Sequence, residues 1–289
     1  MPSSLILLLT IFTMSVVPEH GGAPGPAPTR EARLRVGPDG VPVVRVEVAP
    51  GRLAWFVVDT GATGTTIATT LADRLGVLSS GRTLVTTIAG STSVPIGRLG
   101  TLRIDGVTVA RDLDVAIHDL RLVRETVADA EGILGQDVLG RFDYLIDLER
   151  GRLVLGWIEP PRDGVRVPLS WSADRPVLHF PGTRNRHALV LDSGANVLVI
   201  DADAADDALG PERGQRRPAG LETHVGRRDV QVEHHPALRL ADLDLGAVDV
   251  LRVDDEAWTS GPEVGLLPAS VFRRVYVSAR RGEAMVWER

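Results

Sequence analysis

Short runs of apolar and β-branched residues, bounded by Gly, Pro and Asp, recur along the chain from about residue 35. Runs of this length and spacing are typical of β-strands. The clearest are PVVRVEVA at 42–49, LAWFVVD at 53–59, LRIDGVTVA at 102–110 and LDVAIHD at 113–119. Gly106, within the third of these runs, predicts a hairpin turn.

Two short segments instead predict helices. Residues 68–75 are followed by Gly76 and residues 202–209 by Gly210, and a glycine just after the last helical residue is a common stop signal. We therefore expect a mainly β fold with one helix in each half of the chain. A helical bundle or an array of βαβ units does not fit this pattern.

The second half of the chain repeats the first at an offset of about 133 residues. WFVVDTGA at 55–62 aligns with ALVLDSGA at 188–195, and ILG at 133–135 aligns with LLP at 266–268. Because separate segments agree on one offset, the sequence predicts two related β-barrel-like lobes rather than a coincidence of turns.

The connection between the halves, at 157–171, contains three prolines. We therefore predict an N-terminal lobe at 35–157 and a C-terminal lobe at 158–289, each of ordinary domain size. Residues 1–34 precede both lobes.

The N-terminal segment has the features of a targeting signal. LILLLTIFTMSVV at 5–17 carries no charge and is followed by a Pro/Gly/Ala-rich stretch. The run is short for a membrane span but has the length of a signal-peptide core. We expect residues 1–34 to be a signal peptide or membrane tether with a linker. The lobes would then be periplasmic, secreted or tethered outside the cytoplasm. A misassigned start or a docking helix is the alternative, because no Lys or Arg precedes the run.

Composition narrows the function. The net charge of −6 argues against nucleic acid as a partner. The absence of cysteine excludes disulfides, thiolate metal sites and a cysteine nucleophile. A hydrophobic content of 44% is enough for a sizeable core.

Metal sites are the main competing chemistry. The group formed by Glu233 with His224, His234 and His235 has no recognised zinc spacing, and a solvated strand end is the favoured interpretation. The acidic runs at 201–207 and 252–256 lack EF-hand spacing and are interpreted as charged surface. No G-x-S-x-G or H-E-x-x-H motif is present. We expect neither a metal nor a cofactor.

Each half carries an Asp-Thr-Gly or Asp-Ser-Gly triplet directly after an apolar run, at 59–61 and 192–194. Pseudo-twofold symmetry would bring Asp59 and Asp192 face to face. Two carboxyl groups ~3 Å apart cannot both ionise, so they share a proton. One can then take a proton from water while the other donates one to a carbonyl oxygen.

With these two loops, residues 35–287 resemble the aspartic peptidases, the pepsin and retropepsin class. The duplication in one chain is similar to pepsin, and the loop sequences VVDTGAT and VLDSGAN are similar to retropepsins. QDVLGRFDYLIDLERGRLVL, at 136–155, is also typical of bacterial retropepsin-like members. The resemblance implies the acid protease fold, two β-lobes with a cleft between them. It also implies a polypeptide substrate, and we expect a monomer.

The resemblance assigns roles to particular positions. Asp59 and Asp192 would form the catalytic pair. Ile133, Leu134 and Gly135 would cross beneath the first catalytic loop, whereas Pro268 departs from this element in the second half. The loop-supporting residues would include Thr60 with Gly61 in the first loop and Ser193 with Gly194 in the second.

The family also has a flap, a hairpin that closes over the substrate. Its candidate here is TTIAGSTSVPIG at 86–97, with Ala89, Gly90 and Ser91 at the tip. An ordinary exposed hairpin is an equally good interpretation. The matching place in the second lobe is THVGRRDVQVEHHP at 223–236.

The sequence thus predicts an aspartic endopeptidase whose Asp59/Asp192 pair activates a water molecule. The alternative is a retropepsin-like protein that binds peptides or an envelope component without cleaving them. Pro268 and the unmatched flaps leave that alternative open.

Overall fold

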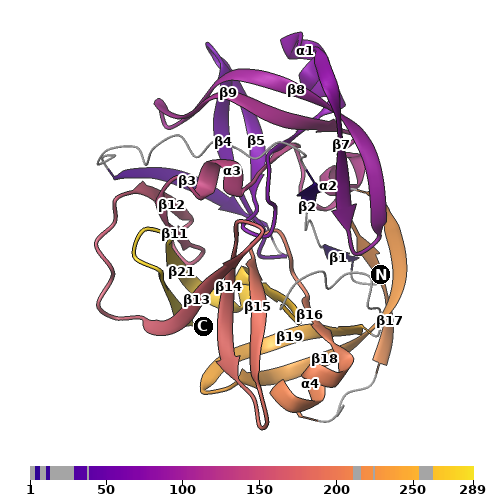
Figure 1. The fold of residues 1–289 in the computed structure, drawn as a ribbon, viewed down its shortest axis with the longest axis vertical. Coiled ribbons are helices and arrows are strands. Elements are labelled where there is room, and N and C mark those ends of the chain that lie inside the picture. The colour runs from indigo at the N-terminus through magenta and orange to yellow at the C-terminus, as the bar shows by residue number, and fades with distance from the viewer. Residues whose placement is uncertain are drawn as a thin grey trace.

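The computed structural model describes residues 4–6, 11–13, 29–37, 39–210, 216–223, 225–253 and 263–289. The molecule is mainly β, as predicted, and its two halves lie one above the other in Figure 1.

In the first half, six strands close into a β-barrel by pairing in the order β4-β5-β10-β6-β9-β8 and back to β4. The pairings β5–β10 and β6–β9 are parallel and the remaining ones are antiparallel. β7 extends the sheet beyond β8 and forms a hairpin with it. The strands are β4 (Pro42–Ala49), β5 (Arg52–Val58), β6 (Thr66–Ala68), β7 (Ser79–Thr87), β8 (Gly90–Ile104), β9 (Val107–His118) and β10 (Ala130–Leu134).

The second half repeats this strand order as β14-β15-β20-β16-β19-β18-β17. Its parallel pairings, β15–β20 and β16–β19, occur at the same two places as in the first half. The strands are β14 (Arg175–Pro181), β15 (Arg186–Asp192), β16 (Leu198–Asp201), β17 (Arg216–Glu222), β18 (Arg227–Leu240), β19 (Leu243–Val253) and β20 (Gly265–Pro268). The repeated topology accounts for the repeat in the sequence.

A third, antiparallel sheet joins the halves in the order β3-β12-β11-β21-β22-β13. Its central pairing, β11 with β21, joins strands from the two halves. The side chains of Tyr144 and Tyr276, among the largest that are fully buried, lie on these two strands. The strands are β3 (Arg30–Val36), β11 (Asp143–Asp147), β12 (Arg152–Gly156), β13 (Val165–Ser172), β21 (Phe272–Ser278) and β22 (Glu283–Glu288).

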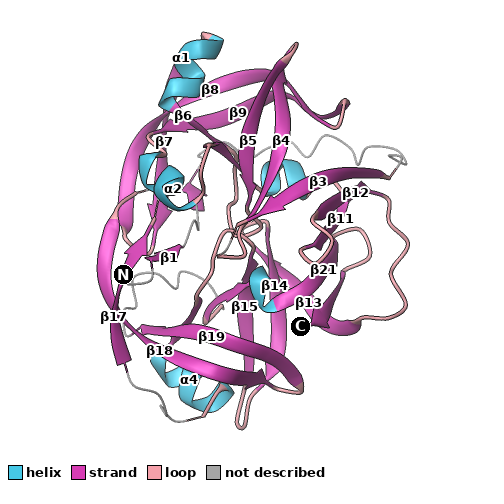
Figure 2. Ribbon diagram, turned by 180° about the vertical axis from the view of Figure 1, so that it is seen from behind, coloured by secondary structure: helices cyan, strands magenta, loops and turns pink. Residues whose placement is uncertain are grey.

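The two predicted helices are present as α1 (Thr69–Leu75) and α4 (Ala202–Ala208). α1 ends at Gly76, which has the left-handed φ of 65° that glycine adopts without strain. α4 begins at Asp201, whose carboxylate accepts a hydrogen bond from the N–H of Ala204. Figure 2 shows them at opposite ends of the molecule.

The prediction of one helix in each half was too low for the first half. The first half also contains α2 (Arg121–Thr126) and α3 (Gln136–Leu139), and the second contains the short 3-10 helix η2 (Ala269–Val271). These helices are too short for a periodic pattern of apolar residues to develop along them.

Much of the predicted signal segment, at 7–10 and 14–28, lies outside the described residues. Two short strands are described before residue 29. β1 (Ser4–Ile6) pairs with β17, and β2 (Ile11–Thr13) pairs with β7. β3 begins at Arg30, within the segment that we predicted as a linker. No helix in the described ranges is long and apolar enough to cross a membrane.

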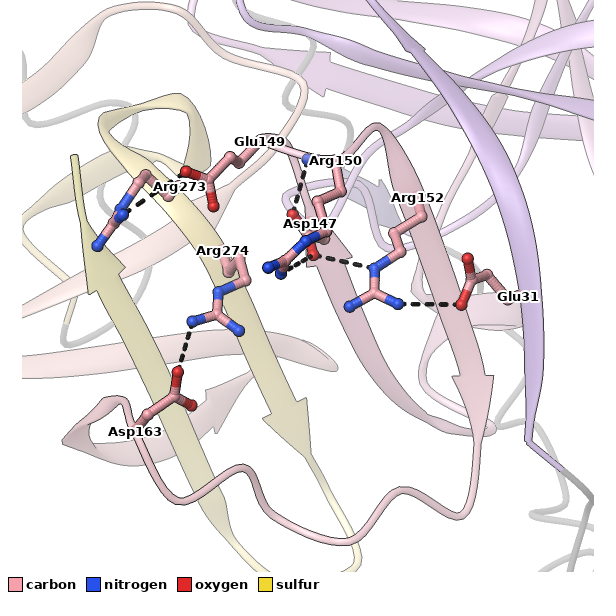
Figure 3. Close-up of polar contacts among 8 residues, drawn as sticks. All are labelled: Glu31, Asp147, Glu149, Arg150, Arg152, Asp163, Arg273 and Arg274. Atoms are coloured by element: carbon pink, nitrogen blue, oxygen red, sulfur yellow. Dashed lines mark hydrogen bonds and ion pairs between the residues drawn. The ribbon is translucent and has the colours of Figure 1, made fainter.

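Charged side chains form a network along the joining sheet (Figure 3). Asp147, which is fully buried, accepts hydrogen bonds from the backbone N–H of Arg150 at 2.9 Å and from Nε of Arg152 at 3.0 Å. Arg152 also contacts Glu31, and Arg274 contacts Asp163 at 2.7 Å. Between the halves, the backbone N–H groups of residues 148 and 149 donate to the carbonyl of residue 273.

We predict that Asp147→Asn lowers the free energy of unfolding by about 1–3 kcal/mol, because an amide N–H₂ replaces a buried acceptor that faces arginine donors. Glu149→Gln is the matched control. Its pair with Arg273 is exposed and 3.6 Å long, so its removal should cost at most about 1 kcal/mol. Urea denaturation measures both changes. Equal losses would show that Asp147 contributes no more than a surface charge.

Candidate active site

The two Asp-containing loops meet where the halves face each other. Asp59 directly follows β5, and Asp192 is the last residue of β15. Both aspartates are fully buried. The structure therefore brings together the two carboxyl groups that the sequence placed 133 residues apart.

Hydrogen bonds lock the loops together reciprocally. The hydroxyl of Thr60 donates to the carbonyl of Leu191 at 2.6 Å and accepts from the N–H of Ser193 at 3.0 Å. The hydroxyl of Ser193 donates to the carbonyl of Val58 at 2.7 Å and accepts from the N–H of Thr60 at 3.0 Å. Each hydroxyl thus holds the backbone on both sides of the opposite aspartate.

The glycine of each loop lies against the carboxyl group of the other. A Cβ atom added to Gly61 would lie 2.6 Å from Cγ of Asp192, and one added to Gly194 would lie 2.7 Å from Cγ of Asp59. No larger residue fits at either position without moving an aspartate. These contacts also show how closely the two carboxyl groups approach the loop interface.

One oxygen of each carboxyl group is bound by its own loop. Oδ1 of Asp59 accepts from the N–H groups of Gly61 at 2.9 Å and Ala62 at 3.0 Å, and Oδ1 of Asp192 accepts from the N–H of Gly194 at 2.8 Å. The other oxygen, Oδ2 in both residues, is buried and has no hydrogen-bond partner in the part of the chain that the structure describes.

Burial raises the pKa of both carboxyl groups. For Asp59 it is the largest cause, and the charge of Asp192 raises the pKa further, while N–H groups of its own loop lower it. Burial is also the largest cause for Asp192, while the N–H of Gly194 and the charge of Arg175 lower its pKa. Two adjacent buried carboxyl groups hold one proton between them over a range of pH, because ionising both is unfavourable.

Ile133, Leu134 and Gly135 support the first loop as the resemblance implied. Ile133 and Leu134 pair with Val57 and Val58 of β5, and the carbonyl of Leu134 accepts from the N–H of Asp59 at 3.0 Å. Gly135 packs on the backbone of Gly64, where an added Cβ would lie 2.5 Å from the carbonyl carbon.

The role of Gln136 in supporting the first loop was not predicted, although the segment that begins at Gln136 is part of the resemblance. Its backbone N–H donates to the carbonyl of Ala62 at 2.9 Å, and its side-chain amide donates to the carbonyl of Thr60 at 3.0 Å. A single polar residue after a glycine has no local signal of such a role.

The second loop is supported differently, because Pro268 occupies the place of Gly135. In the first half, the N–H of Gly135 donates to the hydroxyl of Thr65 at 3.3 Å. At the repeat offset, the second half has Pro268 and the buried Leu198 instead. Donor and acceptor are thus lost together, and no buried polar group is left without its partner. Pro268 still pairs with Asp192 in the parallel register.

The predicted flap is the hairpin of β7 and β8, with Ile88 and Ala89 between the paired residues Thr87 and Gly90. Ser91 pairs with Thr86 just below this tip. The corresponding turn of the second half joins β17 to β18. Figure 1 shows both hairpins on the same side of the molecule.

The two hairpin tips contact each other and pack across the halves. The hydroxyls of Thr87 and Thr223 are 3.3 Å apart. Ile88 is buried in an apolar cluster whose other members are mostly second-half residues, including Val177 and Val190. Val225 packs in return on a first-half cluster. Ile88 is therefore embedded in the other half, whereas Gly90 and Ser91 of the predicted tip are exposed and Ala89 is half-buried.

The proposed histidine metal group has other partners. His234 contacts Asp249 at 3.0 Å, and His235 contacts Glu233 at 3.1 Å. Glu233 is buried and pairs with Arg252, which corrects its interpretation as part of a solvated strand end. His224 lies outside the described residues. Within the described ranges, no three metal-ligating side chains lie together.

One residue of the first acidic run is not on the surface as predicted, whereas Asp203 and Asp206 are exposed. Asp207, in α4, is buried and accepts hydrogen bonds from the hydroxyl of Thr183, the N–H groups of Arg184 and Asn185, and Nε2 of His187. These bonds, led by that of Thr183, hold the pKa of Asp207 below its usual range. The carboxylate thereby anchors the turn between β14 and β15. Residues 254–256 of the second acidic run lie outside the described residues.

Comparison with known proteins identifies the class. A family model described as aspartyl protease matches residues 43–138. This segment contains Asp59 and the 133–135 element, and the match confirms the resemblance to the aspartic, retropepsin-like peptidases. The match covers residues 43–138 of the first half, and it supports a protease that acts on polypeptides. A search of curated proteins found no match.

We predict that Thr60→Val and Ser193→Ala each lower the free energy of unfolding by about 1–3 kcal/mol, because each leaves buried backbone groups without a partner. The double variant should lose less than the sum of the single losses, since the bonds form one network. Chemical denaturation of the parent, the two single variants and the double variant measures all four stabilities of this double-mutant cycle. Strict additivity would contradict the reciprocal network.

Proposed function

We propose that the protein is an aspartic endopeptidase in which Asp59 and Asp192 activate a water molecule to hydrolyse a peptide bond. The observation that carries the proposal is the pair of buried carboxyl groups, locked face to face and each with its Oδ2 unengaged by the described protein groups. Residues 43–138 support it through the family match.

The chemistry follows from the shared proton. The ionised carboxylate takes a proton from water as the water oxygen bonds to the peptide carbonyl carbon, and the protonated carboxyl donates its proton to the carbonyl oxygen. The C–N bond of the resulting diol then breaks. The leaving nitrogen takes the proton that came from water, and the diol returns its own proton to the pair. No metal or cofactor takes part.

The second candidate is a peptide-binding protein without catalysis. It is favoured by the complete burial of both aspartates and by the embedding of Ile88 in the opposite half, which together close the site. The two functions differ in whether an unfolded protein is cleaved between pH 3 and 7. They also differ in whether a statyl-type transition-state analogue stops the cleavage.

We predict that Asp59→Asn and Asp192→Asn each reduce turnover by at least ~100-fold, because an amide can neither accept the proton of water nor share one with its neighbour. kcat on one peptide measures the loss. The matched control is Asp249→Asn, a partly buried carboxylate bound by His234, which should retain parental turnover. Near-normal cleavage by either Asp59→Asn or Asp192→Asn would contradict the assignment of these residues as the catalytic pair.

The same dyad variants should be more stable than the parent at neutral pH. A carboxyl group whose pKa is raised on folding destabilises the folded state above the unfolded pKa, and the cost grows until the folded pKa is reached. We therefore expect Asp59→Asn to gain stability relative to the parent at pH 7. The gain should shrink towards pH 4.

Asp207→Asn is the control of opposite sign. The pKa of Asp207 is lowered on folding, so its ionised form stabilises the protein above the unfolded pKa and loses that effect as the pH falls. This variant should lose stability at pH 7 and less at low pH. Melting temperatures measured between pH 4 and 7 for the parent, Asp59→Asn and Asp207→Asn test both predictions. A loss of stability in Asp59→Asn at pH 7 would contradict the raised pKa.

A further inference from the structure

A buried ion pair lies beside the dyad in the second half only. Arg175 and Glu263, whose side chains are 3% and 7% exposed, contact each other at 2.6 Å. Glu263 also accepts from the hydroxyl of Ser172 at 2.9 Å, and Nε of Arg175 donates to the carbonyl of Ser172 at 3.2 Å. Both charged groups are therefore held in one arrangement.

Strand register places Arg175 beside Asp192. β14 and β15 are antiparallel, and Val177 pairs with Val190. This is the last pair of the ladder, and extending its register by two residues directs Arg175 towards Asp192, on whose pKa its charge acts. Arg175 is also fixed from the other side, since it pairs with Ser172 across the tight turn of β13 and β14.

The first half shows that the fold does not need this pair. Val43 pairs with Val57 there, so the residue opposite Asp59 is the buried Val41. The place of Glu263 at the repeat offset is taken by the buried Ala130. Replacing a buried ion pair by apolar residues is often neutral or stabilising. Fold stability alone therefore does not explain why the ion pair of Arg175 and Glu263 is present beside Asp192 and absent beside Asp59. An electrostatic effect on Asp192 does explain it.

We propose that Arg175, held by Glu263, is a positioning residue that keeps the negative charge of the dyad on Asp192 and the proton on Asp59. Asp192 is then the base that takes the proton of water, and Asp59 is the acid that protonates the carbonyl oxygen. This assignment rests on the proposed peptidase function.

The electrostatics agree with the geometry. Burial raises the pKa of Asp192 and the charge of Arg175 lowers it, whereas burial and the charge of Asp192 both raise the pKa of Asp59. Arg175 interacts with both aspartates, and more strongly with Asp192 than with Asp59. The titratable groups nearest Asp192 are Asp59 in the facing loop, Arg175 on β14 and Glu263 before β20. Further along these strands, His179 of β14 contacts Ser170 at 2.7 Å and Arg186 of β15 is exposed. On β15 itself His187 is bound to Asp207, and Asp174 is in the exposed turn before Arg175.

The test is the pH dependence of kcat/KM, measured on one peptide. The quantity compared is the acid limb, the rise of kcat/KM at low pH as the base of the dyad ionises. Arg175→Gln removes the cation and should move the limb to higher pH by about one unit, the low end for a close charge. Glu263→Gln removes the carboxylate that offsets the cation and should move the limb to lower pH. Arg175→Lys keeps the charge and should stay within about 0.3 unit of the parent. Opposite shifts from the two partners are not expected of a pair that only stabilises the fold.

Arg252→Gln is the matched control. Arg252 is 7% exposed and contacts the buried Glu233 at 2.7 Å, and neither acts on the dyad. Its variant should lose stability without moving the limb. The proposal is overturned if Arg175→Gln and Glu263→Gln shift the limb in the same direction, or if neither shifts it. If Arg175→Gln does not fold, the downward shift of Glu263→Gln decides.

A second measurement separates this proposal from the peptidase assignment. Carboxyl ¹³C shifts of labelled aspartate, assigned with Asp59→Asn and Asp192→Asn, report which residue ionises first. Asp192 should titrate at lower pH than Asp59 in the parent, and at higher pH than in the parent when Arg175 is Gln. Asp59 ionising first would overturn the charge assignment. A parent that never cleaves but shows this order would refute the peptidase function alone.

Discussion

The reciprocal hydrogen bonds of Thr60 and Ser193 are the constraint on which the candidate site depends. Each hydroxyl accepts an N–H and donates to a carbonyl of the opposite loop, so neither aspartate can move unless the other half moves with it. Buried backbone groups would lose their partners if the halves separated, and such groups are costly to leave unsatisfied. The joining sheet extends the same constraint outward, since β11 and β21 fix the halves at their base.

The two halves have the same topology and differ in what surrounds each aspartate. Leu198 and Pro268 replace a hydrogen-bonded pair of the first half, which keeps the second loop supported by apolar contacts. Arg175 lies beside Asp192, whereas Val41 lies beside Asp59. A duplicated fold thus gives symmetrical positions to the two carboxyl groups, and later differences in a few neighbours give them unequal affinities for the shared proton.

The local features of the sequence predicted the strands, the helices that end at glycines and the two Asp-containing loops. Their signals lie within a few neighbouring residues, such as a run of β-branched residues or Gly76 after α1.

The remaining features depend on register between distant segments. Glu263 meets Arg175 only because β20 and β14 both pair with β15. Ile88 is predicted as a hairpin tip by its neighbours, but nothing near it in sequence shows that it packs into the other half. In the sequence, nothing distinguishes Asp207 from the other aspartates of α4. Its burial and its hydrogen bonds depend on the turn at 183–187, which packs against it in the fold.

Asp59 and Asp192 are fully buried, so the proposed peptidase function requires the protein to open without disturbing the aspartates. The contacts that close the two sides of the site differ in strength. Below the aspartates, four buried hydrogen bonds and a continuous sheet join the halves. Above them, the hairpin tips meet through one long hydroxyl contact, Thr87 to Thr223, and through the single side chains of Ile88 and Val225. Withdrawing two apolar side chains costs less than breaking a network that leaves charged and polar groups unpaired. Under the proposed peptidase function, opening at the hairpins would therefore admit a substrate while Asp59 and Asp192 keep their places.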